Sequence, residues 1–478
     1  MADTNAKLEV VPCWFNNPYG LSHYRCLRMH VNETPHQPDS PLISFPVIHF
    51  PSQEKSISAQ PVLHLGGGGP GAALHLDDDY SVFSLFEEMR ALSVDQGRDL
   101  FLMDARGSGL SQPRLTCFEF TDNVVDRWST NLALEDAYRD GRQDISRCIA
   151  RYRDQGISFS AYSGNSVVHD IERLRVALGV ERWVLYGVSY ASIYAQMYAT
   201  VHADKVDTMI LDSATFIDID HHEAIVRETV EPYQRLFDSC TAAVECPFSR
   251  TGIEQKFWAL AAKLDAQPLA IALPRPKNAG EFIAILNGWR FIDSVLWGTY
   301  SEEIFDDFPT IISDLEAGST DSIRPYAEAL LEFLTSDSFG DISSESHYCV
   351  EKKPYIDTAT LVANISLIPY AYARKIALLG VTFDDHCQEL SISGTSENAA
   401  LPVKTNVPTL FVHGELDSVT LLQHVLDRRA NFRNSRVLTS LQAHSVLDDA
   451  CIRAAAASFL RNGFAQQSDI NCGSITVN

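Results

Sequence analysis

Residues 183–191 of the chain read WVLYGVSYA, an apolar run that ends in a tight turn around Ser189. The run has the composition of a strand that is buried on both faces, and an apolar helical pattern (residues 193–198) follows the turn directly. A strand, a sharp turn and a helix in this order strain the backbone of the central residue, which small neighbours two positions away permit. Gly187 and Ala191 hold those positions, although glycine is more usual at the second. We therefore expect the Ser189 hydroxyl to project from the turn at the start of a helix.

Other short apolar runs resemble this strand and extend the pattern along the chain. They lie at residues 61–65, 100–103, 208–211 and 409–412. Helical patterns separate most of these runs, which is typical of an α/β fold with a mostly parallel sheet and helices on both faces.

The strand signal fades between about residue 216 and residue 395, where helical stretches such as 253–264 and 322–334 dominate. This middle segment is predicted to be an inserted helical cap. The predicted organisation is a core in two parts, residues 1–215 and 396–478, with the cap at 216–395 between them.

Length, charge and hydropathy exclude several classes of protein. The chain has 478 residues, 45% of them hydrophobic, which fits a large globular fold and neither disorder nor a fibrous repeat. A net charge of −24 disfavours binding to nucleic acids, so a neutral or cationic ligand is expected. We predict no membrane insertion, because no run of apolar residues reaches the length of a membrane-spanning helix. The oligomeric state stays open.

The ten cysteines form an even set that falls into sequence-neighbour pairs. We interpret them as five local disulfides, each removing on the order of 3 kcal/mol of unfolded-state entropy. The pairs are 13–26, 117–148, 240–246, 349–387 and 451–472. The alternative is a set of reduced thiols in a cytosolic enzyme. Disulfides imply an oxidising compartment, and the first residues lack the apolar segment of a signal peptide. We therefore expect the mature chain of a secreted or periplasmic protein.

A serine nucleophile needs a base and an acid, and both are expected later in the chain. The run 409–412 leads into His413-Gly414-Glu415-Leu416-Asp417, which places Asp417 at the carboxyl edge of the sheet. Asp417 is the predicted acid, with Glu415 as the alternative. A helix (421–429) and a strand (436–439) are predicted before His444, the predicted base. An ordinary serine in a turn remains the structural alternative.

The glycine-rich stretch from Gly66 to Gly71 follows the strand at 61–65. Residues without side chains let backbone N–H groups approach the oxyanion of a tetrahedral intermediate. We predict that the N–H groups of Gly69 and Tyr190 form this oxyanion hole. A flexible linker is the alternative, whereas a phosphate-binding loop lacks its Lys-Ser/Thr ending.

Two acidic clusters, at residues 77–79 and 218–223, precede helical stretches. Acidic residues at such positions cap helices and complement their dipoles, so we expect no metal site and no cofactor.

These motifs together resemble the α/β-hydrolase fold, and within it the prolyl-aminopeptidase and tripeptidyl-aminopeptidase-like family of serine peptidases. The motifs are Gly68-Gly69-Pro70-Gly71, Asp104-Ala105-Arg106-Gly107-Ser108-Gly109-Leu110-Ser111, Gly187-Val188-Ser189-Tyr190, Gly414 to Asp417, and His444. Arg106 is expected to hold its loop beside the site. The cysteine spacing also looks like that of the larger, secreted members of the family.

The resemblance implies an enzyme that cleaves residues from free N-termini and holds the substrate ammonium with carboxylates of the cap. Cys349-Val350-Glu351 resembles the family's Cys-x-Glu stretch, which makes Glu351 the candidate for binding the amine. A solvated glutamate at a helix end is the competing interpretation. The predicted function is amide cleavage through an acyl-enzyme, with a small peptide as substrate.

The main alternative is a carboxylesterase or amidase that uses the same Ser189-His444-Asp417 triad on an ester substrate. A binding protein on an inactive scaffold has little support, because every catalytic position is filled. A dehalogenase or epoxide hydrolase would need a carboxylate at position 189.

Overall fold

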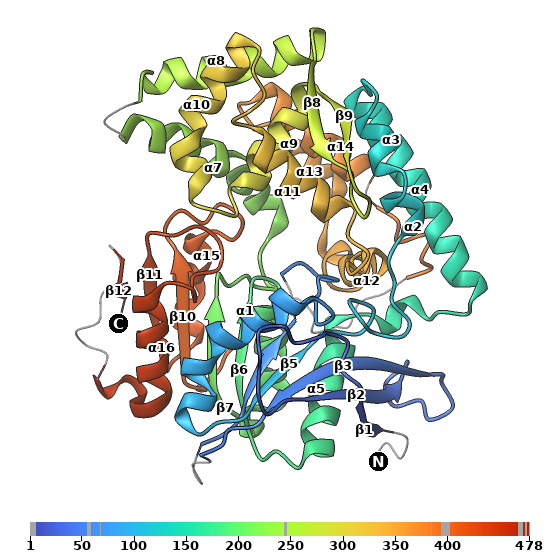
Figure 1. Cartoon of the computed structure of the whole chain (residues 1–478), viewed down its shortest axis with the longest axis vertical. Helices are drawn as coiled ribbons and strands as arrows, with labels where there is room; N and C mark the ends of the chain where they lie inside the picture. The colour runs from blue at the N-terminus through green and yellow to red at the C-terminus, as the bar shows by residue number, and fades with distance from the viewer. Residues whose placement is uncertain are drawn as a thin grey trace.

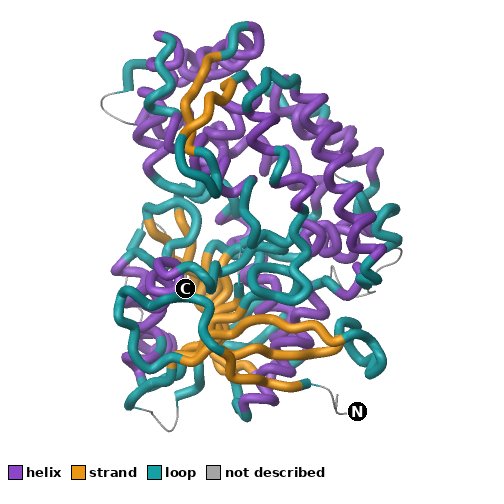
Figure 2. The backbone as a smooth tube through the Cα atoms, turned by 45° about the vertical axis from the view of Figure 1, so that its right-hand side comes forward, coloured by secondary structure: helices purple, strands orange, loops and turns teal. Residues whose placement is uncertain are grey.

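The structure is a computed structural model that describes residues 6–54, 59–66, 68–242, 246–383, 385–392, 402–466, 472–473 and 476–477. Most of its strands gather in the lower part of the molecule, and a layer made mostly of helices lies above them (Figures 1 and 2). The catalytic residues predicted from the sequence all lie within the described part of the chain.

A ten-stranded sheet forms the core, in the order β1-β2-β3-β5-β4-β6-β7-β10-β11-β12. The strands from β5 to β11 in this order run parallel, whereas β1, β2, β3 and β12 pair antiparallel. The strands are β1 (Lys7–Val11), β2 (Arg25–Asn32), β3 (Leu42–Phe50), β4 (Val62–Leu65), β5 (Leu100–Met103), β6 (Trp183–Val188), β7 (Val206–Asp212), β10 (Thr409–Gly414), β11 (Ser435–Ser440) and β12 (Thr476–Val477). All predicted strands are present.

Helices cover both faces of this sheet, because neighbouring residues of a strand point to opposite sides. Leu185 of β6 packs in one apolar cluster with α5 (Gly164–Leu178) and α6 (Ala191–Val201). Val184, its neighbour, packs in the other with α1 (Asp79–Met89) and α16 (Ala450–Asn462). The predicted α/β architecture is confirmed.

The three N-terminal strands were not predicted. The edge strand β1 is largely exposed, so it lacks the continuous apolar pattern that identified the inner strands. Pro46 lies inside β3, opposite Arg28 of β2, and a proline within an apolar run argues against a strand.

Most of the upper layer consists of helices with their own apolar core. The bounds are α7 (His221–Ala242), α8 (Arg250–Ala266), α9 (Gly288–Gly298), α10 (Glu303–Ala317), α11 (Arg324–Leu334), α12 (Asp341–His347), α13 (Thr358–Ile365) and α14 (Ala371–Phe383), followed in the core by α15 (Leu422–Arg428). The layer also contains an antiparallel hairpin of β8 (Leu269–Pro274) and β9 (Glu281–Leu286). Helices dominate the middle segment, as predicted, but this hairpin was not predicted; its alternating buried and exposed residues cover the helices with one face only.

Residues before the predicted cap also join the upper layer. The short helices α2 (Phe118–Thr121) and α3 (Val124–Trp128), with the long α4 (Leu134–Asp154), lie beside α12, α14 and β9 (Figure 1). Val124 and Trp128 belong to the apolar core of the cap, and the Trp289 indole donates to the carbonyl of Leu132 (2.9 Å). The helical layer therefore draws on two segments of the chain, which differs from the predicted division. The boundary near residue 395 lies outside the described residues.

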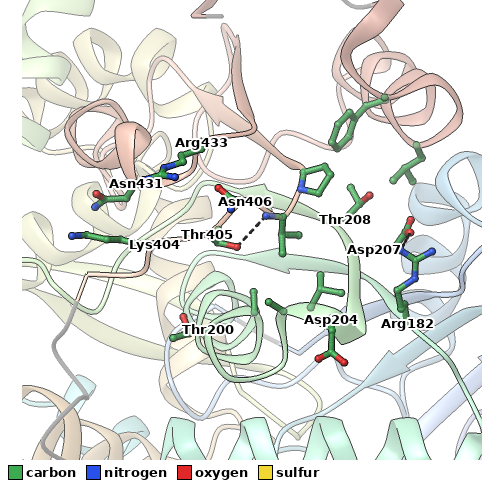
Figure 3. A pocket seen from close by; sticks show the side chains of 18 of the residues that line it. Arg182, Thr200, Asp204, Asp207, Thr208, Lys404, Thr405, Asn406, Asn431 and Arg433 are labelled. Atoms are coloured by element: carbon green, nitrogen blue, oxygen red, sulfur yellow. Dashed lines mark hydrogen bonds and ion pairs between the residues drawn. The ribbon is translucent and has the colours of Figure 1, made fainter.

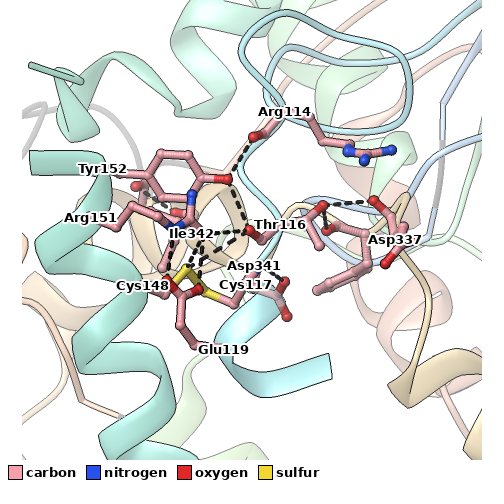
Figure 4. The surroundings of a disulfide bond; sticks show 12 residues. Arg114, Thr116, Cys117, Glu119, Cys148, Arg151, Tyr152, Asp337, Asp341 and Ile342 are labelled. Carbon is pink, nitrogen blue, oxygen red and sulfur yellow. Dashed lines mark hydrogen bonds and ion pairs between the residues drawn. A yellow bond between two sulfur atoms is a disulfide. The ribbon is translucent and has the colours of Figure 1, made fainter. Parts of the chain in front are cut away.

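All five predicted disulfides are present, with Cα–Cα distances of 5.1–5.6 Å. Cys117–Cys148 joins α2 to α4 beside the cap helix α12 (Figure 4). Hydrogen bonds surround this disulfide: the Tyr152 hydroxyl donates to the Thr116 carbonyl (2.9 Å), and the backbone N–H of Cys117 donates to the Asp341 carboxylate (2.7 Å). Among the residues that the structure describes, none of the helices has both the length and the apolarity needed to cross a membrane.

Candidate active site

Ser189 lies at the sharp turn between β6 and α6, as predicted. Its φ of 54° is in the left-handed region, which a residue with a side chain seldom adopts. The turn is so tight that a Cβ on Gly187 would stand 2.8 Å from the carbonyl oxygen of Ala191. Gly187 is therefore required, whereas the methyl group of Ala191 is accommodated in the buried interior.

The predicted base and acid are hydrogen-bonded to each other. His444 Nδ1 lies 3.0 Å from Asp417 Oδ2, and Asp417 is fully buried. A carboxylate at Nδ1 requires the proton there, which leaves Nε2 of the neutral ring as the acceptor for a serine proton. Glu415, the alternative acid, instead accepts a hydrogen bond from Thr439 Oγ1 (2.5 Å).

The pair is electrostatically suited to stabilise an imidazolium. Burial opposes the charge on Asp417, but His444, His413 and the N–H of Thr420 outweigh it and hold the pKa of Asp417 well below its usual value. Burial likewise opposes the charge on His444, and the Asp417 carboxylate raises the pKa of His444 above its usual value. Thr420 donates to Asp417 through both its N–H (2.9 Å) and its hydroxyl (2.8 Å), so the acid is fixed as an ionised acceptor.

Asp212, the last residue of β7, and Ser213, which follows it, connect the turn of Ser189 with the loops that carry Asp417 and His444. Neither residue was predicted from the sequence. The carbonyl of Asp212 accepts the N–H of Ser189 (2.9 Å), and its carboxylate accepts the N–H of Val446 (3.0 Å) in the loop that carries His444. Ser213 Oγ accepts the N–H of Ser445 (2.9 Å). The carbonyl of Ser213 lies 2.9 Å from the Thr420 hydroxyl, whose single proton it shares with Asp417.

Backbone strain marks the same place. Ser189, Ser213 and Ser445 have φ values of 54°, 46° and 68°. Strained residues of this kind persist where the surrounding contacts fix them, and they gather at functional sites. A signal for Asp212 did exist in the sequence, because an acidic residue ends the buried run at 208–211. Its partners in the loop of His444, Val446 and Leu447, lie more than 200 residues away, so these contacts could not be read from the sequence.

The glycine-rich loop passes directly over the nucleophile. A Cβ on Gly68 would stand 3.1 Å from Ser189 Oγ, so only glycine fits there. The loop is clamped at Gly71, whose carbonyl accepts the N–H of Gly340 in the cap (2.8 Å). Gly69 follows with a φ of 72°, and Tyr190 begins the helix after Ser189. Donation by these two N–H groups to an oxyanion stays a prediction.

Arg106 holds the loop beside the site. Its guanidinium is buried and forms two hydrogen bonds with Asp170 (2.7 and 2.6 Å). It also donates to the carbonyls of Glu33 (2.5 Å) and Ala161 (3.0 Å). Arg106 therefore bonds only to groups of the protein itself in these contacts and holds its loop in place, as the sequence suggested.

Glu351 lies close to the nucleophile, in the short π-helical turn Tyr348–Lys352 that follows α12. Its side chain is buried, and Oε2 accepts the phenol of Tyr190 (2.6 Å), the residue next to Ser189. Oε1 accepts the N–H of Gly164 at the start of α5. Glu351 and Lys352 also line a cavity of about 290 Å³. The interpretation of Glu351 as a solvated helix-end residue is therefore wrong.

A cavity of about 1180 Å³ lies elsewhere (Figure 3). Val206, Asp207 and Thr208 line it at the start of β7, and Thr405 to Pro408 line it just before β10. The triad lies at the opposite, carboxyl ends of these strands, as in other parallel α/β sheets. This cavity therefore plays no part in the candidate active site.

Comparisons with known proteins agree with this arrangement. Residues 62–242 match a family described as the alpha/beta hydrolase fold, and residues 380–472 match one described as TAP-like protein. The chain is 23% identical to the serine protease Hip1 of Mycobacterium tuberculosis (strain H37Rv), over 97% of this chain and 91% of that protein. It is 24% identical to the putative hydrolase YuaR of Escherichia coli K12, over 66% of this chain and 62% of that protein.

Similar solved structures include an epoxide hydrolase mutant of Vigna radiata, at 13% identity and a TM-score of 0.37 over 96% of this chain and 98% of that one. Another is an esterase of Exiguobacterium antarcticum, at 12% identity and a TM-score of 0.35 over 88% and 96% of the two chains.

The two matched segments, residues 62–242 and 380–472, contain Ser189 and both of its predicted partners, Asp417 and His444. The sheet order, the turn at Ser189 and the Asp417–His444 pair have the arrangement that these segments imply. The chain has the α/β-hydrolase fold, resembles TAP-like proteins in its C-terminal part, and is a serine hydrolase.

Proposed function

We propose that this serine hydrolase is an exopeptidase that acts at free N-termini through an acyl-enzyme. One observation carries the proposal: Ser189 on its strained turn and the Asp417–His444 pair are tied together through Asp212 and Ser213. A nucleophile, a base and an orienting acid held by buried hydrogen bonds are the requirement for acyl transfer. The similarity to a protein named serine protease Hip1 supports peptide bonds as the target.

The proposed reaction has two stages. His444 Nε2 takes the Ser189 proton as Oγ attacks the carbonyl carbon of the substrate, and the same proton passes to the leaving amine when the C–N bond breaks. Water then attacks the acyl-enzyme while His444 accepts a proton from that water, and His444 returns the proton to Ser189 Oγ as the bond from Oγ to the acyl carbon breaks. The N–H groups of Gly69 and Tyr190 hold the oxyanion, and loss of one such donor typically costs about 3 to 4 kcal/mol of barrier.

Glu351 is the proposed anchor for the substrate ammonium. It accepts a hydrogen bond from the Tyr190 side chain. The cavity of about 290 Å³ that it lines is also lined by the acidic residues Asp218 and Asp220. A charge-assisted hydrogen bond to the ammonium would contribute about 1.5 to 3 kcal/mol. Peptides with a blocked N-terminus would lose this contribution.

The experiment compares hydrolysis of one short peptide anilide with its N-terminus free, the same anilide acetylated, and a short-chain aryl ester. We expect the free amine to be cleaved best, and all three activities to be absent in Ser189→Ala. Glu351→Gln should reduce kcat/KM for the free peptide about 10- to 100-fold and leave the ester nearly unchanged. Glu345→Gln is the matched control, because Glu345 lies in the same cap segment and faces His386 (3.2 Å).

A carboxylesterase or amidase is the second candidate, and one observation favours it. Both oxygens of Glu351 already accept hydrogen bonds, from Gly164 and Tyr190, which is what a purely structural carboxylate would do. Preference for the blocked peptide or the ester, with equal effects of Glu351→Gln on all substrates, would establish this alternative and remove the ammonium-binding role.

We infer a secreted or periplasmic location from the disulfides, because such bonds persist in oxidising compartments. The test is a thiol titration of the purified, denatured chain without reductant. No free thiol is expected, whereas ten reactive thiols in material isolated from its native compartment would contradict the proposed location.

A further inference from the structure

An exposed group of aromatic side chains begins at the base, and the mechanism above does not use it. Tyr300 follows α9, and its ring lies edge-on to the His444 imidazole, with ring centroids 5.2 Å apart. The backbone N–H of His444 also donates to the backbone carbonyl of Tyr300 (3.3 Å), which fixes the cap loop against the base. In this position Tyr300 keeps 42% of its surface exposed.

The aromatic rings continue as a strip away from His444. The ring centroid of Trp297 lies 4.8 Å from that of Tyr300 and 4.4 Å from that of Phe333, on which Trp297 stacks. The ring centroids of Phe333 and Phe339 are 5.4 Å apart. Phe333 is 36% exposed, which is unusual for a phenylalanine in a cluster of four rings. We call Tyr300, Trp297, Phe333 and Phe339 the aromatic strip.

The strip ends at a cavity of about 720 Å³, which Phe333 helps to line. His75, which follows the glycine-rich loop, lines the same cavity and is hydrogen-bonded to Ser338 of the cap (3.2 Å). The aromatic strip therefore leads from the base to an open space between the glycine-rich loop and the cap.

The chemistry of acyl transfer indicates which part of a substrate lies beside the aromatic strip. The leaving nitrogen takes its proton from His444, so it must come within hydrogen-bond distance of that ring. The acyl part lies toward the oxyanion hole and Tyr190, whose phenol bonds Glu351. The residue that carries the leaving nitrogen is therefore the one within reach of Tyr300.

We propose that the aromatic strip is the binding site for the leaving group, and that it selects peptides whose first residue after the scissile bond is aromatic or large and apolar. An aromatic side chain gains both burial and ring contacts on such a surface. The proposal rests on the proposed acyl-enzyme, and extends it to the other side of the scissile bond.

Capture of the acyl-enzyme by added amines tests this site without depending on how the acyl part is recognised. The acyl-enzyme is formed from the aryl ester or anilide that the enzyme hydrolyses best, in the presence of phenylalanine amide or alanine amide. The amine nitrogen attacks the acyl carbon, its proton passes to His444 and on to Ser189 Oγ, and the bond from Oγ to the acyl carbon breaks. The measured quantity is the ratio of aminolysis to hydrolysis for each amine, after subtraction of the reaction with Ser189→Ala.

We expect phenylalanine amide to give a ratio about tenfold or more above that of alanine amide. Phe333→Ala should remove most of this difference, and Phe333→Leu, which keeps an apolar side chain and protects the fold, should retain part of it. Tyr80→Ala is the control, because Tyr80 is an exposed aromatic residue (62%) of α1 that lies outside the strip.

Each remaining outcome is informative. Equal ratios for the two amines, or a preference that survives Phe333→Ala unchanged, would overturn the inference while leaving the acyl-enzyme mechanism intact. If no ester or anilide is turned over at all, the proposed function fails, and the inference fails with it.

Discussion

At the scale of single residues, Asp212 matters most after the triad itself. Its carboxylate accepts the N–H groups of Val446 (3.0 Å) and Leu447 (3.2 Å) and the phenol of Tyr186 (2.9 Å), and it lies near the imidazole of His444. Burial raises the pKa of Asp212 to about 6, and the negative charge of Asp417 acts in the same direction. Asp212 is a positioning residue: it fixes the loop of His444, and its charge supports an imidazolium there.

The first prediction concerns Asp212→Asn. Asparagine keeps an acceptor for the loop N–H groups but removes the negative charge, so the pKa of His444 should fall. Since His444 must be neutral to accept the serine proton, the acidic limb of the kcat/KM profile should move to lower pH. Because asparagine has only one acceptor oxygen where Asp212 uses two, the loop of His444 should also shift, which should lower kcat about 10- to 100-fold.

The profile separates this role from simple destabilisation, which would lower activity without moving the limb. Asp448→Asn is the matched control, since Asp448 lies in the same loop but is exposed to solvent. A limb that stays in place in Asp212→Asn would contradict the electrostatic part of the argument.

The positions of the three proposed triad residues in the fold were predictable because each follows a strand whose apolar run is visible in the sequence. Asp212 and Ser213 also follow such a run, yet their function depends on partners in the loops at 420 and 445–447. Glu351 shows the same limit. The residue was predicted from a motif, but its bond to Tyr190 depends on how the cap folds over the sheet.

At the scale of elements, the turn from β6 to α6 depends on residue size. A Cβ at Gly187 would stand 2.8 Å from the carbonyl oxygen of Ala191 and 3.0 Å from the nitrogen of Ser192. These are backbone atoms, which cannot move without displacing Ser189. We predict that Gly187→Ala lowers kcat at least about 100-fold.

Ala191→Gly is the informative comparison for the same turn. It restores the more usual residue, so activity should remain, while stability should fall by about 0.5 to 1 kcal/mol because glycine is less favourable than alanine in a helix. Chemical denaturation with a turnover assay measures both quantities. Loss of activity in Ala191→Gly, or full activity in Gly187→Ala, would refute this account of the turn.

Most elements that are buried on both faces were predicted closely, and half-exposed elements were not; β3 is the exception, because it is almost fully buried but contains Pro46. The strand predicted at 100–103 is β5 with the same bounds, whereas β1 to β3 escaped notice. The hairpin β8–β9 was missed for the same reason, because only one of its faces is buried. Its partners, α3 and α11, come from two distant segments, and only the folded cap brings them together.

At the scale of the whole molecule, buried acidic groups should make stability depend on pH. Burial raises the pKa of Asp104 to about 7 and that of Asp341 to about 7. Burial, with the charges of Asp212 and Asp448, raises the pKa of Glu88 to about 7. In the unfolded chain these groups ionise near their ordinary values of about 4.

The sign follows from proton binding. Between about pH 4 and pH 7 the folded protein keeps protons that the unfolded chain has lost, so these groups stabilise the fold most at the acidic end and lose that contribution as pH rises through 7. The net charge of −24 adds repulsion that grows in the same direction. Asp417 acts oppositely, but its pKa is so low that its contribution is constant over this range.

We therefore predict a higher free energy of unfolding at about pH 5.5 than at about pH 8, by several kcal/mol, since a tenfold change in a group's proton affinity on folding corresponds to about 1.4 kcal/mol. Thermal unfolding with the disulfides intact, measured across this range, tests it. Asp104→Asn should flatten the pH dependence by one group's share, because asparagine does not titrate, whereas Asp126→Asn, in the exposed surface of α3, should leave the slope unchanged. A protein that is more stable at pH 8 than at pH 5.5 would mean that these carboxyl groups are ionised in the fold.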